Sequence, residues 1–312
     1  MQHPFPFDPT YGYDEAALLK VAAPPEVSDF ADFWRATYDE ARAVPTDTVM
    51  RSIASPRRGY DVFEAEFTGL GGARVGAWIT VPHGGFARGV VAGHGYGGRS
   101  GPDFPIPGPP AAAIFPCARG FDRSAAPGIP DNAEEHVVFG IEHRETYLHR
   151  FCAADLWTAA SVLLELFPAA EGNLHYLGVS FGGGMGALAL PWDDRFQRAF
   201  LDVPSFGNHP LRVTLPCAGS GESVRRQYAT RPEILETLRY FDAAVAATHL
   251  RIPTLAGCAL FDPAVPPPGQ FCVYNSLAGP KELFVHPAGH FPYREERHDA
   301  RRLFQALENW FA

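Results

Sequence analysis

The chain lacks long apolar runs and any regular pattern of cysteines. No apolar stretch approaches the roughly 20 residues that span a bilayer, so we expect no membrane segment. Residues 1–6 show no basic region followed by an apolar run, so we expect no signal peptide. The five cysteines are scattered, odd in number and without a CxxC pair, which argues against a disulfide framework or a zinc site. Free thiols in a reducing compartment are the better interpretation, and we expect a cytoplasmic protein.

Positive charge is also in short supply. Lys and Arg number 26 against 35 Asp and Glu, which leaves a net charge of −9. Such a balance argues against nucleic acid or an anionic membrane as partner, and it is compatible with a small neutral substrate. Apolar residues make up 46% of the chain, and its 24 Phe residues favour an aromatic interior or pocket. No internal repeat or low-complexity tract divides the sequence, so we expect one domain over residues 1–312.

Helical periodicity occurs in three main segments. Residues 27–43 carry aromatic side chains at i, i+3, i+4 spacing, and Ser28 stands where an N-cap would. We expect this helix to belong to an N-terminal extension, 1–45, packed on the body. The patterns at 146–167 and 299–311 predict two more helices. Residues 205–248 indicate a helical insertion interrupted by Pro and Gly, which we interpret as a cap over the site.

The predicted strands are short apolar runs bounded by turn residues, at 60–67, 73–81, 89–93, 111–118, 174–177, 198–203, 254–260 and 282–286. The turn 68–72 predicts a hairpin between the first two. Pro116 suggests an edge strand or a bend. Strands alternating with helices favour an α/β fold, a mostly parallel twisted sheet with helices on both faces.

Residues 178–182 read Gly-Val-Ser-Phe-Gly, the G-x-S-x-G pattern in which a strand turns sharply into a helix and exposes a serine hydroxyl. The glycines on either side of Ser180 relieve the crowding of that turn. The small-residue segment 183–190 predicts a helix that packs closely against a sheet. A glycine-rich structural turn is the alternative, but these flanks favour a nucleophile and hence a serine hydrolase.

A serine hydroxyl needs a base to take its proton, and the base needs an acid to orient it. In this pattern the chain order is serine, acid, histidine. Asp262 follows the strand 254–260 and His290 follows the strand 282–286, at the carboxyl ends where open α/β sheets place their sites. Asp202 is an alternative acid and His286, inside its strand, a weaker alternative base.

The developing oxyanion needs backbone N–H donors. Phe181, directly after the nucleophile, should supply one, and Tyr96 in the glycine-rich loop 94–98 the other. That loop does not have dinucleotide-binding spacing. Metal binding is disfavoured because Glu145 and His149 form no H-E-x-x-H motif, and a solvated helical face explains them better.

On these residues the chain resembles the acetyl xylan esterase and cephalosporin C deacetylase family, carbohydrate esterase family seven, within the α/β-hydrolases. Ordered matches cover nearly the whole chain, at 32–34, 67–72, 94–98, 119–120, 147–155, 178–184, 240–242, 262, 266–267, 274–275, 279–282 and 289–290. The resemblance implies the triad Ser180, Asp262 and His290, with the Tyr96 and Phe181 amides as oxyanion hole. It also implies deacetylation of small acetylated sugars, no cofactor, and often a homohexamer.

The chain departs from the family pattern beside the site. Where the family usually reads R-G-Q and S-Q-G-G, this sequence has Phe121 after Arg119-Gly120 and Phe181 after Ser180. Loss of two glutamines makes the surroundings less polar, which puts xylan or cephalosporin substrates in question. We expect Phe121, Arg119 and His94 to contribute to the substrate pocket and substrate choice to differ at Phe181.

Overall fold

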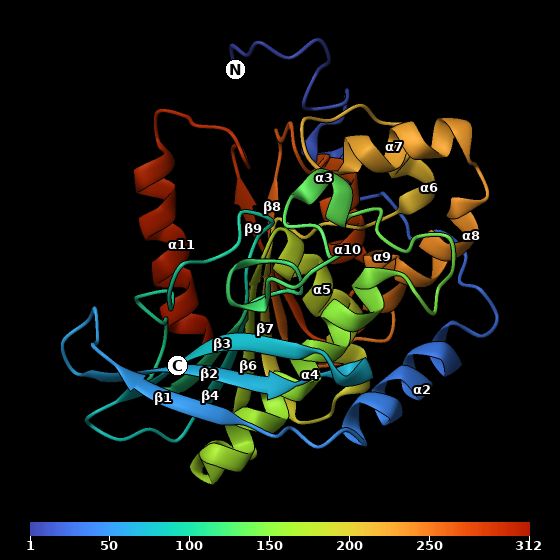
Figure 1. The fold of residues 1–312 in the computed structure, drawn as a ribbon. Coiled ribbons are helices and arrows are strands. Elements are labelled where there is room, and N and C mark those ends of the chain that lie inside the picture. Colours follow the sequence, from blue (N-terminus) through green and yellow to red (C-terminus); the bar gives the residue numbers. More distant parts are fainter.

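A nine-stranded sheet forms the centre of the computed structural model, which describes residues 1–312 (Figure 1). The strands lie in the order β1-β2-β3-β5-β4-β6-β7-β8-β9. β1, β2, β3 and β5 pair antiparallel, whereas all pairs from β5 through β4 to β9 are parallel. The strand bounds are β1 Val49–Ile53, β2 Tyr60–Thr68, β3 Arg74–Pro82, β4 Gly89–Gly93, β5 Ala112–Pro116, β6 Leu174–Val179, β7 Phe196–Asp202, β8 Thr254–Ala259 and β9 Lys281–His286.

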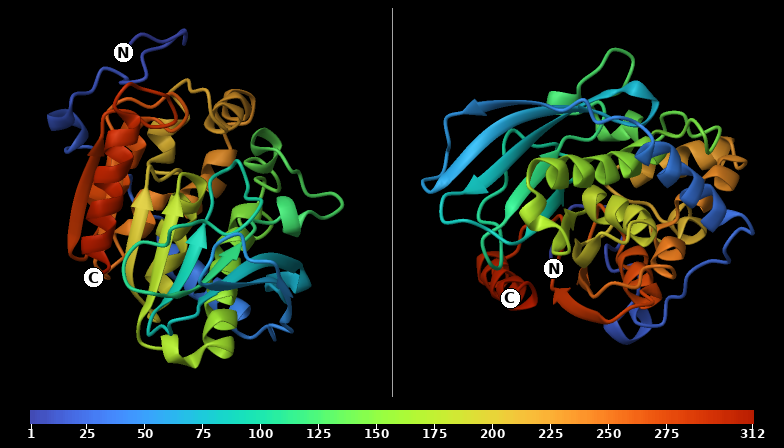
Figure 2. Two further views of the ribbon diagram at one scale, coloured as in Figure 1. Left: turned by 90° about the vertical axis from the view of Figure 1, so that its left-hand side faces the viewer. Right: turned by 90° about the horizontal axis from the view of Figure 1, so that it is seen from below.

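Helices cover both faces of this sheet, as predicted, but unequally. Their bounds are α1 Glu15–Leu18, α2 Phe30–Arg42, α3 Ala133–His136, α4 Leu148–Leu166, α5 Phe181–Ala189, α6 His209–Arg212, α7 Gly221–Thr230, α8 Ile234–Leu238, α9 Ala243–Ala247, α10 Pro267–Ser276 and α11 Glu296–Trp310. Short 3₁₀ turns span Leu70–Gly72, Asp122–Ser124, Pro168–Ala170, Leu190–Trp192 and Arg239–Phe241. Most helices gather on one side, and α11 covers the other (Figure 2). There Leu307 and Trp310 pack on Phe200 and Leu255 of the sheet.

Most of the helices and strands predicted from the sequence are present in the structure. Two details of the prediction are wrong, the N-cap of α2 and the position of β5 in the sheet. The hairpin is β2 and β3 in register, and its turn needs glycine because Gly71 and Gly72 have φ of +76° and +78°. The N-cap of α2 is Asp29 rather than Ser28. β5 is an interior strand rather than an edge, since Pro116 stands at its last position and costs little pairing there.

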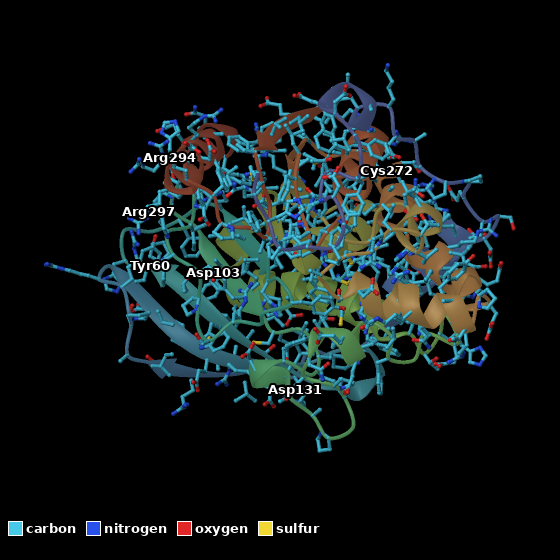
Figure 3. All side chains as sticks on the ribbon, turned by 90° about the horizontal axis from the view of Figure 1, so that it is seen from above. Tyr60, Asp103, Asp131, Cys272, Arg294 and Arg297 are labelled. Atoms are coloured by element: carbon cyan, nitrogen blue, oxygen red, sulfur yellow. The ribbon has the colours of Figure 1, made fainter.

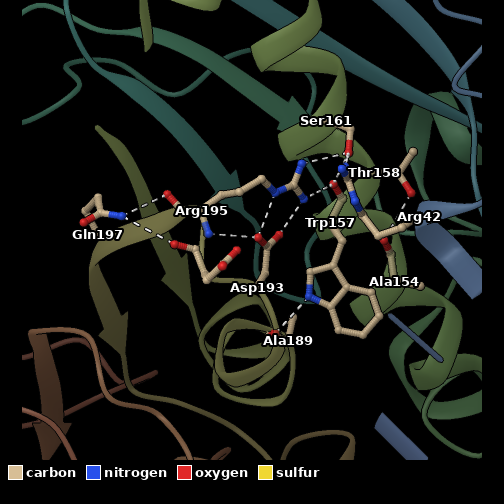
Figure 4. Close-up of polar contacts among 10 residues, drawn as sticks. Arg42, Ala154, Trp157, Thr158, Ser161, Ala189, Asp193, Arg195 and Gln197 are labelled. Carbon is tan, nitrogen blue, oxygen red and sulfur yellow. Dashed lines mark hydrogen bonds and ion pairs between the residues drawn. The ribbon is translucent and has the colours of Figure 1, made fainter. Parts of the chain in front are cut away.

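A polar network fixes the helix that follows the nucleophile turn. The indole Nε1 of Trp157, on α4, donates to the carbonyl of Ala189 at the end of α5, over 2.9 Å. Arg195 is paired with the buried Asp193 and donates to the carbonyl of Trp157 over 3.0 Å (Figure 4). The two ends of the segment between α5 and β7 are therefore both tied to α4.

All five cysteines are free and buried. Cys272 lies within α10, while Arg294 and Arg297 project from the molecule near the start of α11 (Figure 3). No helix combines the length and the apolar character that crossing a membrane would require.

Candidate active site

Ser180 occupies a strained turn at the carboxyl end of the sheet. It lies between β6 and α5 with φ of 54° and ψ of −110°, a conformation that a non-glycine residue adopts only where its surroundings enforce it. Its N–H donates to the carbonyl of Asp202 over 2.8 Å. A Cβ on Gly178 would lie 2.5 Å from the carbonyl oxygen of Gly182, and one on Gly182 would lie 2.6 Å from Gly93. Both glycines of the motif are required for this close approach.

Ser180, His290 and Asp262 form one continuous hydrogen-bonded chain. The distance from His290 Nε2 to Ser180 Oγ is 2.9 Å, and that from His290 Nδ1 to Asp262 Oδ2 is 2.8 Å. A carboxylate only accepts hydrogen bonds, so the proton of the neutral imidazole belongs on Nδ1 and leaves Nε2 free to accept from the serine hydroxyl. This arrangement can withdraw the proton of Ser180 when the oxygen attacks.

The carboxylate of Asp262 is fully buried and fully bonded. The amides of Ala264 and Val265 donate to Oδ1, each over 2.9 Å. The side chain of Gln270, on α10, donates to Oδ2 over 2.9 Å beside the bond from His290. These donors offset the cost of burying the charge and hold the carboxylate in one orientation. Sequence reasoning missed Gln270 because nothing in the chain marks a residue eight positions on as a partner.

The environment of His290 favours its charged form. Burial lowers the pKa of the imidazole, but the hydrogen bond to Asp262 and the charges of Asp262 and Asp202 outweigh burial and leave the pKa raised. The side chain is 28% exposed, so the base is accessible to a substrate while its acid is not.

A second histidine–aspartate pair lies beside the first. His286 Nε2 is 2.8 Å from Asp202 Oδ1, so the two alternatives that the sequence left open bond to each other rather than to Ser180 or His290. Gly257, on the strand between them, makes room, because a Cβ there would lie 2.1 Å from the Asp202 carboxylate. Both side chains line a groove of about 500 Å³ next to His290.

The loop 94–98 is fastened next to Ser180. A Cβ on Gly95 would lie 3.7 Å from that of Ser180. His94 is buried, which lowers its pKa to about 4 and keeps the ring neutral. Its Nδ1–H donates to the carbonyl of Gly95 over 2.6 Å, and Nε2 accepts from the Ala118 amide over 2.9 Å. The Tyr96 amide has no partner within the chain, and Phe181 is the first residue of α5, where N–H groups lack intrahelical acceptors.

Two buried histidines hold the Tyr96 side chain. His136 Nε2 donates to the carbonyl of Arg119 over 2.9 Å, so its Nδ1 accepts from the Tyr96 hydroxyl at 3.3 Å. His149 Nε2 donates to that hydroxyl over 2.9 Å. The placement of His149 on a solvated helical face is therefore wrong: it is fully buried on α4, because an aromatic cluster covers that face of the helix.

No group of three or more His, Cys, Asp or Glu side chains is arranged to hold a metal ion.

Comparison with known families decides the identification. The family described as acetyl xylan esterase matches residues 20–309 of this chain. The chain belongs to the acetyl xylan esterase family. This confirms the resemblance in the sequence, over almost its full length.

Two solved acetyl xylan esterases share the fold of this family member. The enzyme from Paenibacillus sp. R4 has a TM-score of 0.80 and 21% identity, covering 95% of this chain and 100% of its own. The enzyme from Thermoanaerobacterium sp. JW/SL YS485 has a TM-score of 0.80 and 20% identity, covering 96% and 99%. The architecture is thus an α/β-hydrolase fold. An acetyl esterase of Xylanibacter ruminicola is 22% identical over 158 residues, half of this chain and 36% of that protein's length.

Phe121 and Phe181 pack around Tyr96. The Phe181 ring centroid lies 4.3 Å from that of Tyr96, and that of Phe121 lies 5.9 Å away. Both side chains are almost fully buried. Their contacts with the Tyr96 ring make them part of the packing that supports the loop 94–98.

Arg119 and His94 were expected to line the substrate pocket, but both side chains are engaged in hydrogen bonds within the protein. Arg119 makes a bidentate pair with Asp155, with both distances at 2.8 Å, and donates to the carbonyl of Leu70. Its side chain is 7% exposed and that of Asp155 is 3% exposed. With these donors engaged, Arg119 does not reach for a substrate, which corrects that expectation.

The N-terminal arm lies over the loops of the acid and the base. The amide of Asp262 donates to the carbonyl of Pro9 over 3.1 Å, and the Tyr11 hydroxyl donates to the carbonyl of Pro216 over 2.7 Å. Phe5 packs on Phe291, directly after His290, with ring centroids 5.9 Å apart. Sequence reasoning missed this contact because it joins residues more than 250 positions apart.

Proposed function

We propose that this protein is a serine carboxylesterase that removes acetyl or other short acyl groups from small, sugar-like esters through an acyl-enzyme on Ser180. One observation carries the proposal, the hydrogen-bonded chain from the Ser180 hydroxyl through His290 to the buried Asp262. Such a chain is what activation of a serine requires. Membership of the acetyl xylan esterase family supports the acetyl group as the group removed.

In the proposed mechanism His290 Nε2 takes the proton as Ser180 Oγ attacks the ester carbonyl. The Asp262 carboxylate stabilises the imidazolium that forms. We assign the oxyanion to the N–H groups of Tyr96 and Phe181, which flank Ser180. His290 then passes the proton to the leaving alcohol, and a water molecule, deprotonated by the same nitrogen, releases the acid from Ser180.

The surroundings of His290 support a polar alcohol as leaving group. Because His290 protonates the alcohol, the alcohol must lie on its side of the site, and the groove of about 500 Å³ lies there. Asp202, His286 and Glu296 give this groove hydrogen-bonding groups, and Tyr293 gives it an aromatic wall. Hydroxyl-rich compounds such as sugars suit that combination.

The aromatic packing beside Ser180 supports a short acyl group. Tyr96, Phe181 and Phe206 pack against one another within ring-centroid distances of 4.3 to 6.5 Å. Side chains packed at this density leave little room for a long acyl chain without rearrangement.

A series of p-nitrophenyl esters with acyl chains of increasing length tests this function. We expect kcat/KM to be highest for the acetate and to fall at least about tenfold by the octanoate, since a long chain must displace packed rings. Release of acetate from acetylated xylobiose tests the sugar-like alcohol. Preference for the octanoate would favour the alternative of a hydrolase for bulkier esters or amides. Failure of a fluorophosphonate to label Ser180 would favour a non-catalytic binding protein.

The raised pKa of His290 predicts the pH dependence of this reaction. The base acts only when neutral, so kcat/KM should fall about tenfold per pH unit below that pKa. We expect the acid limb of the pH–rate profile to have its midpoint above the value of about 6.5 for a free imidazole. Asp262→Asn should lower kcat and also move the midpoint downward, because the charge that raises the pKa is gone. A wild-type midpoint at or below 6.5 would contradict this account.

We also propose that the chain is one domain over residues 1–312 with residues 1–45 as an N-terminal extension and residues 205–248, which hold α6–α9, as a cap. We further propose that the protein is cytoplasmic and that it forms a homo-oligomer. The family resemblance favours a hexamer. We expect no nucleic acid or membrane partner. Rates on cephalosporin C and on sugar acetates, measured side by side, test which ester is the better substrate. Light scattering of the purified protein tests the subunit number.

A further inference from the structure

Four arginines are buried in this protein, and one of them has no partner. Arg119 pairs with Asp155, and Arg88 donates to two proline carbonyls. The guanidinium of Arg99 makes no hydrogen bond, but its Nη2 lies 3.4 Å from the carboxylate of Asp103 and so has a counter-charge. Arg212, at the end of α6, is 7% exposed, yet its Nε and Nη1 atoms have no hydrogen-bond partner and it forms no ion pair. A buried cation without a counter-charge is costly, so its retention calls for an explanation.

The surroundings of Arg212 accommodate its charged group but do not neutralise it. The guanidinium carbon lies 5.6 Å from the ring centroid of Phe206, a cation–π contact that recovers part of the cost of burial. Gly221 also lies next to the Arg212 guanidinium, since a Cβ at this position would be 2.6 Å from Nη2. Space is therefore left for the guanidinium at the start of α7, and no acidic side chain is placed to meet it.

Arg212 lines a pocket whose other walls are mainly apolar. Phe206, Leu211, Leu215 and Val265 contribute to them. The pocket has about 260 Å³ of empty space, open solvent at its mouth included, and about 10 Å³ of it is wide enough to hold roughly one water-sized group. The pocket therefore has room for little more than the head group of a ligand, and Arg212 is the charged side chain that this group would meet.

The walls of this pocket adjoin residues that are bonded to the catalytic site. Pro204 and Phe206 flank Ser205, whose N–H donates to the carbonyl of Ser180 over 3.1 Å. On the opposite wall the amide of Val265 donates to the Asp262 carboxylate over 2.9 Å. The pocket therefore lies close to the framework that holds Ser180 and Asp262, although neither residue lines it.

We propose that Arg212 anchors a carboxylate-binding subsite, and that the esters this protein hydrolyses best carry a carboxylate on their acyl or their alcohol part. The inference rests on the proposed esterase function and adds the substrate class. A carboxylate accepts two hydrogen bonds from the fork of a guanidinium and supplies the missing counter-charge. The apolar side chains of the pocket then contact the carbon skeleton that joins the carboxylate to the ester.

Two matched pairs of substrates test the subsite and locate the carboxylate. For the acyl side, p-nitrophenyl hemisuccinate is compared with its methyl ester after subtraction of the uncatalysed rate. For the alcohol side, 4-acetoxybenzoate is compared with its methyl ester. We expect the wild type to prefer the free acid at least about tenfold in kcat/KM in one of the pairs, as a charged hydrogen bond would provide. The pair that shows the preference identifies the side. Equal rates in both pairs would overturn the proposal.

Variants of Arg212 assign the preference to this side chain. Arg212→Met should abolish it and leave p-nitrophenyl acetate within about threefold of wild type, while Arg212→Lys should keep part of it, because a lysine retains the charge without the fork. Arg226→Met, which removes an exposed arginine of α7, is the matched control and should keep the full preference. A preference that survives in Arg212→Met contradicts the proposal.

A measurement of stability separates this role from a structural one. Removing an unpaired buried cation should leave the melting temperature of Arg212→Met equal to or above that of wild type. If that variant does not fold, the side chain is structural, and the wild-type preference with Arg212→Lys still decides the substrate class. Wild type that fails on p-nitrophenyl acetate would refute the esterase function itself, whereas activity there without any preference for acids refutes only the subsite.

Discussion

Ser180→Ala is expected to lower kcat for p-nitrophenyl acetate by about 10⁶-fold, the scale seen when a catalytic serine is removed from a triad. The variant loses the oxygen that bonds to His290 Nε2, and no other hydroxyl is bonded to that nitrogen. The residual rate should reflect only binding and oxyanion stabilisation. Initial rates at saturating substrate, measured over a wide range of enzyme concentration, check the loss.

The loss should be specific to the reaction. The Ser180 side chain caps no helix and makes one hydrogen bond, so the melting temperature should stay close to that of wild type. Ser52→Ala, on the exposed strand β1, is the matched control and should keep full activity. Wild-type rates in Ser180→Ala, with the protein folded, would remove the triad from the mechanism.

Asp155→Ala is expected to have the largest effect on stability, about 3–5 kcal/mol in the free energy of unfolding. The change leaves the guanidinium of Arg119, which is 7% exposed and donates two hydrogen bonds to this carboxylate, without its counter-charge. The energy lost is mainly the cost of an uncompensated buried charge rather than the value of the pair. Urea unfolding of both proteins, followed by circular dichroism, measures the difference.

A double variant separates the contribution of the buried charge from that of packing. Arg119→Met combined with Asp155→Leu removes both charges, and it should recover much of the lost stability because apolar side chains of similar volume fill the site. Asp32→Ala breaks an exposed contact with Arg35 at 3.7 Å and should have no measurable effect. A double variant no more stable than Asp155→Ala would mean that packing, not charge, dominates at this position.

The sequence predicted the elements of the site better than their contacts. Ser180, Asp262 and His290 were recognisable because a strand precedes each and because the chain order is that of one reaction type. The choice between Asp262 and Asp202 could not be made in this way, since both stand at the carboxyl ends of strands. The choice depends on which carboxylate reaches His290. In the structure Asp262 bonds to His290, and Asp202, at the end of β7, bonds to His286 instead.

Other features have no local signal at all. His149 lies on a helix whose sequence does not show that aromatic rings will cover it, and so its bond to Tyr96 was unpredictable. The same is true of the hydrogen bond from the Asp262 amide to the carbonyl of Pro9. Arg119 was predicted to line the pocket because the local sequence does not show its partner, Asp155, which lies 36 positions further along the chain.

Local chemistry is what the sequence alone determined: the alternation of strands and helices, the glycines that permit the turn at Ser180, the freedom of the thiols and the family. These depend on backbone sterics and on apolar periodicity, which act between near neighbours. The tertiary structure decided which acid meets which base, which arginines are neutralised, and that Arg212 is not. Those outcomes depend on charges brought together from distant parts of the chain, because the energy of a buried charge is set by whatever lies within a few ångströms of it.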